Sequence, residues 1–278
     1  MSVITWTFES KYLRGNTTVS VILPDMPRTR EPAEYFRSRP RHKVLWLLHG
    51  TFGDHSDWIR KTNIELYAEE RGIAVVMPSA LNSDYSNWHD FSLGYEAYDF
   101  FTEELMPMVQ QTLPVSDRRE DNFIAGLSMG GRGTVKYAVN HPERFAAAAV
   151  LSAVPIDLAS IDESELASAT DFLSSRLRLQ VANAGGLEAY RASPDNTWAI
   201  IDRLAPTGVL PHLFFAVGED DLLNDELFPR FAEHAQEIGL DAQFWVSPGH
   251  RHEWRFWDAA ILRALDFFGL PRSESNPF

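Results

Sequence analysis

The sequence predicts an α/β protein with a mostly parallel central sheet and helices on both faces. Continuous apolar runs of strand length recur along the chain, which is typical of strands buried on both sides. Helical segments alternate with these runs, as they do in βαβ units. The chain has 278 residues, 45% of them hydrophobic and 12% aromatic, which is enough for a substantial core. We therefore expect a single domain over 1–278.

The first elements are two alternating strands, Val3–Phe8 and Thr17–Leu23, joined by a hairpin at LRGNT. Residues 24–43 are rich in proline and charge and are expected to form a loop. The buried strands then follow in the runs KVLWLLHG, IAVVMPSA, NFIAG, FAAAAVLSA, PHLFFAVGEDD and DAQFWVSPGH.

The expected helices lie between and after these runs, at Asn63–Arg71, Tyr95–Leu113, Arg132–Asn140, Glu226–Ile238 and His252–Gly269. Pro107 should kink or break the second of them. The long segment 155–208 is helical and irregular. It is too short to hold a good core alone, so we interpret it as a small cap-like insertion.

Charge and composition exclude several classes of function. The net charge of −14, from 25 basic and 39 acidic residues, argues against nucleic acid or an anionic membrane surface as a partner. There are no cysteines, which rules out disulfides, thiol catalysis and cysteine-ligated metals. The N-terminus does not read as a signal peptide, and no apolar run approaches the ~18 residues of a membrane helix. A cytoplasmic protein is the default expectation.

A serine stands at a predicted strand-to-helix turn. Ser128 lies between Gly126 and Gly130, in the stretch DNFIAGLSMGGRG. Glycine and serine are ordinary turn residues, so the pattern alone is moderate evidence. A nucleophile elbow has the same pattern, but it also needs a base, an acid and oxyanion donors elsewhere in the chain, in a fixed order.

Polar residues at the ends of the other predicted strands meet that requirement. Active sites of such sheets gather beyond the carboxyl ends of the strands. There the sequence places His49–Gly53, Ser128, Gly218–Asp221 and Gly249–His252. These read as oxyanion loop, nucleophile, acid and base. The order Ser, Asp, His is that of the α/β-hydrolase fold.

The chemistry explains each residue type. A serine hydroxyl becomes a useful nucleophile when an imidazole takes its proton, and a carboxylate fixes the tautomer of that imidazole. The tetrahedral oxyanion needs backbone N–H donors. We expect these from Met129, directly after the serine, and from Thr51 in the first strand-end loop.

Five segments together resemble the tributyrin-esterase group of the esterase D and S-formylglutathione hydrolase-like branch of α/β-hydrolases. They are VLWLLHGTFGDHSDWIRKTNIE, GIAVVMPSA, RREDNFIAGLSMGGRGTVKYAVNHPERFAAAAVLS, GEDDLLNDELF and PGHRHEWRFWDAAI. The resemblance implies Ser128 as nucleophile, His252 as base, Asp221 as acid and the Thr51 N–H as oxyanion donor. It implies hydrolysis of short-chain acyl esters without a metal or organic cofactor. Self-association is common in this architecture, so the resemblance also allows for a homo-oligomer.

Two positions keep a competitor. Asp220 adjoins Asp221, and because neighbouring residues at a strand end point differently, only one can face the imidazole. Spacing favours Asp221. His250 follows Pro248-Gly249 and is expected on the turn, which leaves His252 as the base. The pair His250 and His252 lacks an evident third ligand for a metal site.

The aromatic residues near the predicted cleft have alternative interpretations. Trp88 follows a buried strand and could stack on a sugar or an aromatic alcohol, or pack against the cap. Trp58 could line the acyl pocket, although core packing is the stronger interpretation. Trp254 and Trp257 lie three apart on one helix face and are interpreted as structural. His49 is expected to orient its loop from below.

The function we predict is a serine carboxylesterase for small-molecule esters with acetyl to butyryl groups, including acetylated sugars. The runner-up is an S-formylglutathione-type thioesterase, which uses the same triad. The loop His49-Gly50-Thr51-Phe52 differs from the S-G-L-T-C usual in that subgroup. The third hypothesis is a non-catalytic protein on the same fold.

Overall fold

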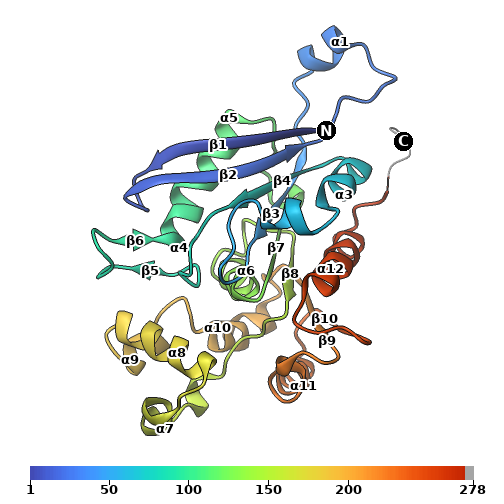
Figure 1. Ribbon diagram of the computed structural model, residues 1–278. Coiled ribbons are helices and arrows are strands. Elements are labelled where there is room, and N and C mark those ends of the chain that lie inside the picture. Colours follow the sequence, from blue (N-terminus) through green and yellow to red (C-terminus); the bar gives the residue numbers. More distant parts are fainter. Residues whose placement is uncertain (273–278) are drawn as a thin grey trace.

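A computed structural model describes residues 1–272 and contains an eight-stranded sheet. The strand order is β1-β2-β4-β3-β7-β8-β9-β10 (Figure 1). β1 and β2 pair antiparallel, as do β2 and β4, and all later pairs are parallel. The strands are β1 (Ser2–Ser10), β2 (Gly15–Leu23), β3 (Lys43–Leu48), β4 (Ile73–Pro78), β7 (Asn122–Leu127), β8 (Ala147–Leu151), β9 (His212–Gly218) and β10 (Ala242–Ser247). This confirms the predicted mostly parallel sheet.

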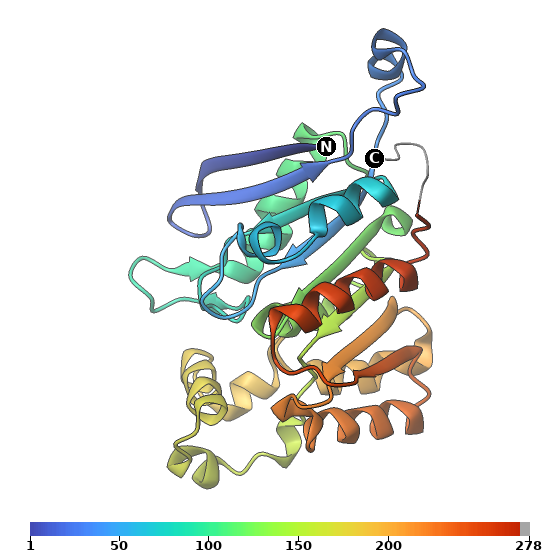
Figure 2. The ribbon, with the colours of Figure 1, turned by 45° about the vertical axis from the view of Figure 1, so that its right-hand side comes forward.

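Helices cover both faces of the sheet (Figures 1 and 2). One face carries α2 (Asp57–Lys61), α3 (Ile64–Arg71) and α12 (Trp254–Phe267). The other carries α4 (Ala97–Asp99), a π-helix (Phe100–Leu105), α5 (Met106–Thr112), α6 (Met129–Asn140), α10 (Thr197–Leu204) and α11 (Leu227–Glu237).

Alternate residues of each buried strand serve opposite faces, which explains the continuous apolar runs. In β3, Val44, Trp46 and Leu48 belong to the core under α5 and α6. Leu45 and Leu47 belong to the core under α3 and α12. The sheet is therefore fixed from both sides, and the ends of its strands form a rigid platform.

The expectations for two segments need correction. Residues 24–43 are not all loop, because α1 (Pro32–Arg37) forms within them with proline at its first turn (Figure 1). Pro107 does not break its helix. The turn before it is π-helical, and the N–H of Met106 donates to Phe101 O. The helix therefore continues past Pro107, although proline has no backbone N–H to donate.

The segment 155–208 stands outside the strand layer (Figure 2). It contains α7 (Glu163–Ser168), α8 (Phe172–Asn183), α9 (Leu187–Arg191) and α10. Its first helices enclose a small apolar cluster of their own, consisting of Leu158, Leu166, Leu177, Val181, Leu187 and Tyr190. Ile200 and Ile201 of α10 join the main core instead. A short hairpin of β5 (Asn87–Trp88) and β6 (Tyr95–Glu96) lies beside it.

Within the part of the chain that the structure describes, no helix is both long and apolar enough to cross a membrane.

Candidate active site

Ser128 occupies a strained position between β7 and α6. Its φ is 52° and its ψ is −115°, a region that a non-glycine residue adopts only at a cost. The backbone holds this turn from both sides: the N–H of Ser128 donates to Leu151 O at 2.8 Å, and Ser128 O accepts from the N–H of Arg132 at 3.0 Å. The side chain is partly exposed at the N-terminus of α6. The chain thus presents a hydroxyl at the carboxyl end of the sheet.

Gly130 allows this helix to approach the neighbouring strand. A Cβ at this position would lie 2.5 Å from Leu48 O and 2.6 Å from His49 O, both of them backbone atoms. No side chain fits there without moving β3 or α6. The residue places the first turn of α6 directly against the loop that follows β3.

The predicted acid and base meet at hydrogen-bond distance. His252 Nδ1 lies 2.8 Å from Asp221 Oδ2. Asp221 is 2% exposed, and its Oδ1 accepts the N–H of Leu223 at 3.1 Å. The exposed competitor Asp220 lies against Arg251 instead, at 3.9 Å. The geometry therefore selects Asp221 over Asp220 as the partner of His252.

The loops that carry this pair are bonded to each other. A Cβ on Gly218 would lie 2.5 Å from His250 O, and the N–H of Asp220 donates to the same oxygen at 2.9 Å. The side chain of His250 bonds Ser247 at 2.9 Å and so supports its own turn. The end of β9 and the loop after β10 are therefore held at a fixed distance.

Ser152 and Trp257 support the Asp221 carboxyl, and neither role is among those predicted from the sequence. Trp257 Nε1 donates to Ser152 Oγ at 3.0 Å, and the Ser152 hydroxyl hydrogen-bonds Asp221. The Trp257 ring also meets the His252 ring edge-on, at 5.1 Å between centroids. Ser152 directly follows β8 with a φ of 49°, so it is a second strained serine at the end of a strand.

Charge favours an ionised Asp221. Burial by itself would raise the pKa of this carboxyl, and the hydrogen bond and charge of His252 are the largest of the effects that oppose it. The Leu223 N–H and the Ser152 hydroxyl act in the same direction, and the resulting pKa is below the ordinary value. The carboxylate is thus available to stabilise an imidazolium.

The loop after β3 carries the predicted oxyanion donor. Phe52 has a φ of 64° and its N–H donates to Asn82 Oδ1 at 2.8 Å. The N–H of Thr51 has no hydrogen-bond partner among residues 1–272. The N–H of Met129 has no partner within α6, because Met129 is the first residue of that helix. Both donors are therefore available to an anion.

His49 supports this loop from below. Its Nδ1 donates to Gly50 O at 2.7 Å, and its Nε2 accepts the N–H of Ala80 at 2.9 Å. Burial lowers its pKa, and this overrides the opposing influence of the Gly50 carbonyl and the nearby carboxylates. The ring is therefore neutral and fully engaged, as expected for a loop-orienting residue.

Of the two tryptophans proposed for substrate binding, Trp58 belongs to the core and Trp88 stays a prediction. Trp58 is 1% exposed, donates its indole N–H to Leu48 O at 3.0 Å and packs edge-on against Trp254. It belongs to the core, so its assignment to the acyl pocket is corrected. Trp88 is half-buried, and its indole N–H donates to Ser83 O at 2.7 Å. It fixes the 83–88 turn.

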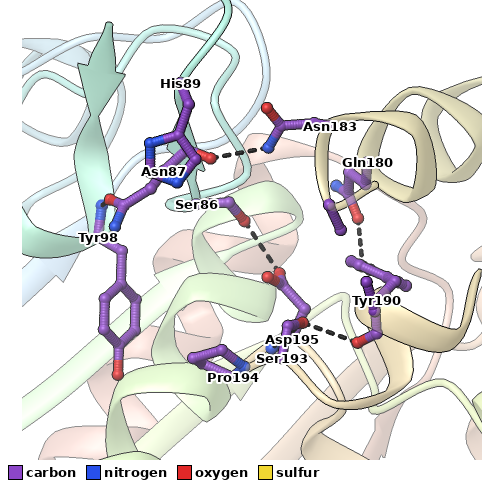
Figure 3. Close-up of a pocket in the computed structure, with 12 residues that line it drawn as sticks. Ser86, Asn87, His89, Tyr98, Gln180, Asn183, Tyr190, Ser193, Pro194 and Asp195 are labelled. Carbon is purple, nitrogen blue, oxygen red and sulfur yellow. Dashed lines mark hydrogen bonds between the residues drawn. The ribbon is translucent and has the colours of Figure 1, made fainter. Parts of the chain in front are cut away.

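A cavity of about 240 Å³ lies between this turn and the insertion, and several amide and hydroxyl side chains line it (Figure 3). Hydrogen bonds cross it at two points: Asn183 Nδ2 donates to Asn87 O at 2.7 Å, and Ser86 Oγ donates to Asp195 Oδ1 at 2.9 Å. Gln180 also lines it, and its Nε2 is buried without a partner among the described residues. That donor is available to water or a polar group in the cavity.

No group of three or more histidine, aspartate or glutamate side chains is placed to hold a metal within residues 1–272.

The fold and the site define an α/β-hydrolase-type serine hydrolase. The chain matches the Esterase family, described as "Putative esterase", over residues 10–268, and it belongs to that family. It is an enzyme that acts on carboxylic ester bonds.

Three relatives are similar over almost their whole length. An acetyl esterase of Caldicellulosiruptor saccharolyticus is 28% identical over 273 residues, 96% of this chain and 98% of the relative. The structure of FphF, a fluorophosphonate-binding serine hydrolase of Staphylococcus aureus, is 30% identical with a TM-score of 0.77. The S-formylglutathione hydrolase FrmB of the same organism is 31% identical with a TM-score of 0.76. Each of these two matches covers 96% of this chain and 98% of the relative.

Proposed function

We propose that the protein is a serine carboxylesterase for short-chain acyl esters, acetyl to butyryl, that acts through Ser128, His252 and Asp221. The observation that carries this is the 2.8 Å contact between His252 Nδ1 and the buried Asp221 carboxylate, at the same sheet edge as the strained Ser128. That arrangement suits an imidazole that accepts a proton at its other nitrogen. The similarity to an acetyl esterase supports the small acyl group.

The mechanism has two halves. Ser128 Oγ attacks the ester carbonyl carbon while His252 Nε2 takes its proton, and Asp221 stabilises the imidazolium. The carbonyl oxygen becomes an oxyanion that accepts hydrogen bonds from the N–H groups of Thr51 and Met129. The intermediate expels the alcohol, which receives the proton from His252. A water molecule then repeats the sequence on the acyl-enzyme, releasing the acid and restoring Ser128.

The substrate is proposed to be an acetylated sugar, whose hydroxyl is the leaving alcohol, or an ester of a simple alcohol. Acetylated xylo-oligosaccharides compared with simple aryl acetates test this point. If only the aryl acetates turn over, the sugar version fails.

The second candidate is an S-formylglutathione-type thioesterase. It is favoured by the 31% identity to FrmB, and a thioester carbonyl suits the same oxyanion donors. Rates on S-formylglutathione and on p-nitrophenyl acetate, measured side by side, decide between the two. A much higher kcat/KM on the thioester would reverse their order.

The primary experiment is hydrolysis of p-nitrophenyl acetate, butyrate, octanoate and palmitate by the wild type and by Ser128→Ala. We expect the short chains to be preferred and the variant to be inactive. A fluorophosphonate probe should label the wild type and leave the variant unlabelled. A Ser128→Ala protein that keeps its rate would refute the mechanism.

A further inference from the structure

A side chain of the insertion reaches the loop that carries the proposed oxyanion donor. Arg176 lies in α8, and its Nη1 donates to Thr51 Oγ1 at 2.5 Å. Its Nε donates to Asp84 Oδ2 at 2.6 Å. The Arg176 side chain is only 13% exposed, so both contacts are shielded from solvent. One guanidinium therefore connects the insertion to two segments of the catalytic domain.

Asp84 is the buried carboxylate that binds Arg176 in this connection. It is 2% exposed and follows β4 with a φ of 54°. Burial alone would raise the pKa of its carboxyl, but the Arg132 and Arg176 guanidiniums outweigh burial and lower it. Arg132 belongs to the helix that begins after Ser128, and its Nη1 lies 4.0 Å from Asp84 Oδ1. The carboxylate thus joins the nucleophile helix to the arginine of the insertion.

The Thr51 loop needs such support. It is not part of a regular element, and Phe52 beside it is 85% exposed with a positive φ. On one side, Asn82 accepts the Phe52 N–H. On the other, the Thr51 hydroxyl accepts from Arg176. An oxyanion donor is effective only when it is held at about 2.7–3.1 Å from the developing charge, so the restraint of this loop affects the transition state more than the ground state.

We propose that Arg176 is a positioning residue that holds Thr51 in place through its hydroxyl, so that docking of the 155–208 insertion sets the rate of acyl transfer. This rests on the proposed function, in which the Thr51 N–H binds the oxyanion. Arg176 does not touch the reacting atoms in this scheme. Arg176 acts through its hydrogen bond to Thr51, and its bond to Asp84 fixes the position of the guanidinium.

Two single variants and their combination test the proposal in the full-length enzyme. In Arg176→Ala, kcat on p-nitrophenyl acetate should fall about 10- to 100-fold, less than the ~10²–10³-fold typical of deleting an oxyanion donor, while KM changes little. Thr51→Val removes the hydroxyl, keeps the N–H and leaves the Arg176–Asp84 pair intact. Thr51→Val should show the same fall in kcat as Arg176→Ala, although its Arg176–Asp84 ion pair is undisturbed. The double variant should lose no more than either single variant, because both remove the same contact.

Three further measurements separate positioning from general loosening of the insertion. Thr51→Ser, which restores a hydroxyl, should recover most of the rate lost in Thr51→Val. Added guanidinium ion should partly rescue Arg176→Ala. An alkylboronic acid, which forms a tetrahedral adduct at Ser128, should bind more weakly to Arg176→Ala by the same factor as the loss in kcat.

Arg178→Ala is the matched control. It lies on the same helix, but among residues 1–272 its guanidinium donates only to Leu166 O, Ala169 O and Ser175 Oγ, all within the insertion. We expect its kcat to stay within about twofold of the wild type. An equal loss in Arg178→Ala, or additive losses for Arg176→Ala and Thr51→Val, would overturn the proposal. If Ser128→Ala is inactive while Arg176→Ala and Thr51→Val keep their kcat, only the positioning role fails. If Ser128→Ala retains activity, the proposed function itself fails.

Discussion

Replacement of Asp221 by asparagine tests the acid of the proposed triad, with Asp220→Asn as its matched control. The Asp221 carboxylate accepts from His252 Nδ1 at 2.8 Å and from the Leu223 N–H at 3.1 Å. An asparagine of the same shape must turn its NH₂ toward one of these donors. If the NH₂ faces His252, Nδ1 must accept, and the ring proton moves to Nε2. That nitrogen can then no longer take the proton of Ser128.

The expected loss in kcat is large. A wrong imidazole tautomer of this kind costs about 10⁴-fold, or about 5.4 kcal/mol of activation free energy. If the NH₂ faces Leu223 instead, two donors oppose each other in a buried site at a cost of about 1–3 kcal/mol, and the imidazolium loses its counter-charge. Either orientation should reduce kcat severely, with little change in KM.

The assay is kcat on p-nitrophenyl acetate at neutral pH, with circular dichroism and thermal melting to confirm folding. Asp220→Asn removes an exposed carboxylate that lies 3.9 Å from Arg251, so its kcat should stay within about twofold of the wild type. The reasoning is refuted if Asp221→Asn is folded and retains a tenth or more of the wild-type rate. A larger loss in Asp220→Asn than in Asp221→Asn would also refute it.

Three further substitutions test the surroundings of the site. Gly130→Ala places a Cβ 2.5 Å from Leu48 O. We therefore expect the free energy of unfolding to fall by about 3 kcal/mol and kcat to fall as well. Wild-type values for both would contradict the close approach of α6 to β3. Ser152→Ala removes a hydrogen bond to the Asp221 carboxylate. We expect kcat to fall about tenfold, which corresponds to ~1.4 kcal/mol of activation free energy for one charge-assisted bond. A kcat equal to that of the wild type would show that this bond is dispensable. Asp84→Asn leaves buried guanidinium groups without their counter-ion and should cost about 3 kcal/mol of unfolding free energy at neutral pH. Because folding lowers the pKa of Asp84, its ionised form stabilises the protein above about pH 4 and loses this effect as the pH falls through the folded pKa. The difference between wild type and Asp84→Asn in urea unfolding should therefore narrow at acid pH, and a constant difference would contradict the assignment.

The ends of the buried strands explain how much of the site could be predicted from the sequence. Apart from the partly exposed edge strand β10, each parallel strand is a short apolar run buried on both faces, so its end is recognisable without a structure. Parallel strands bring those ends to one edge, and this rule predicts that Ser128, Asp221 and His252 lie close together. The same rule applied to β8 would have found Ser152, because Ser152 directly follows the apolar run AAAVL.

The remaining contacts depend on tertiary structure that leaves no periodic signal. Arg176 lies on α8, whose hydrophobic residues are shared between a small satellite cluster and exposed positions such as Phe172. Nothing in that pattern indicates which polar side chain turns back toward Thr51. The spacing of Trp257 correctly predicts a core residue, but apolar periodicity does not reveal where an indole N–H points. The π-helical turn before Pro107 likewise arises from local accommodation of a missing donor.

The position of β10 at the outer edge of the sheet connects activity to local stability. Among residues 1–272, β10 pairs with β9 alone, and its side chains are mostly exposed or partly buried. The loop that follows it carries His252, whose side chain is 42% exposed. Edge elements open at lower free energy than central strands. Loss of turnover during gradual denaturation should therefore precede loss of the central sheet, so that hydrolysis reports the attachment of one peripheral strand rather than the integrity of the whole fold.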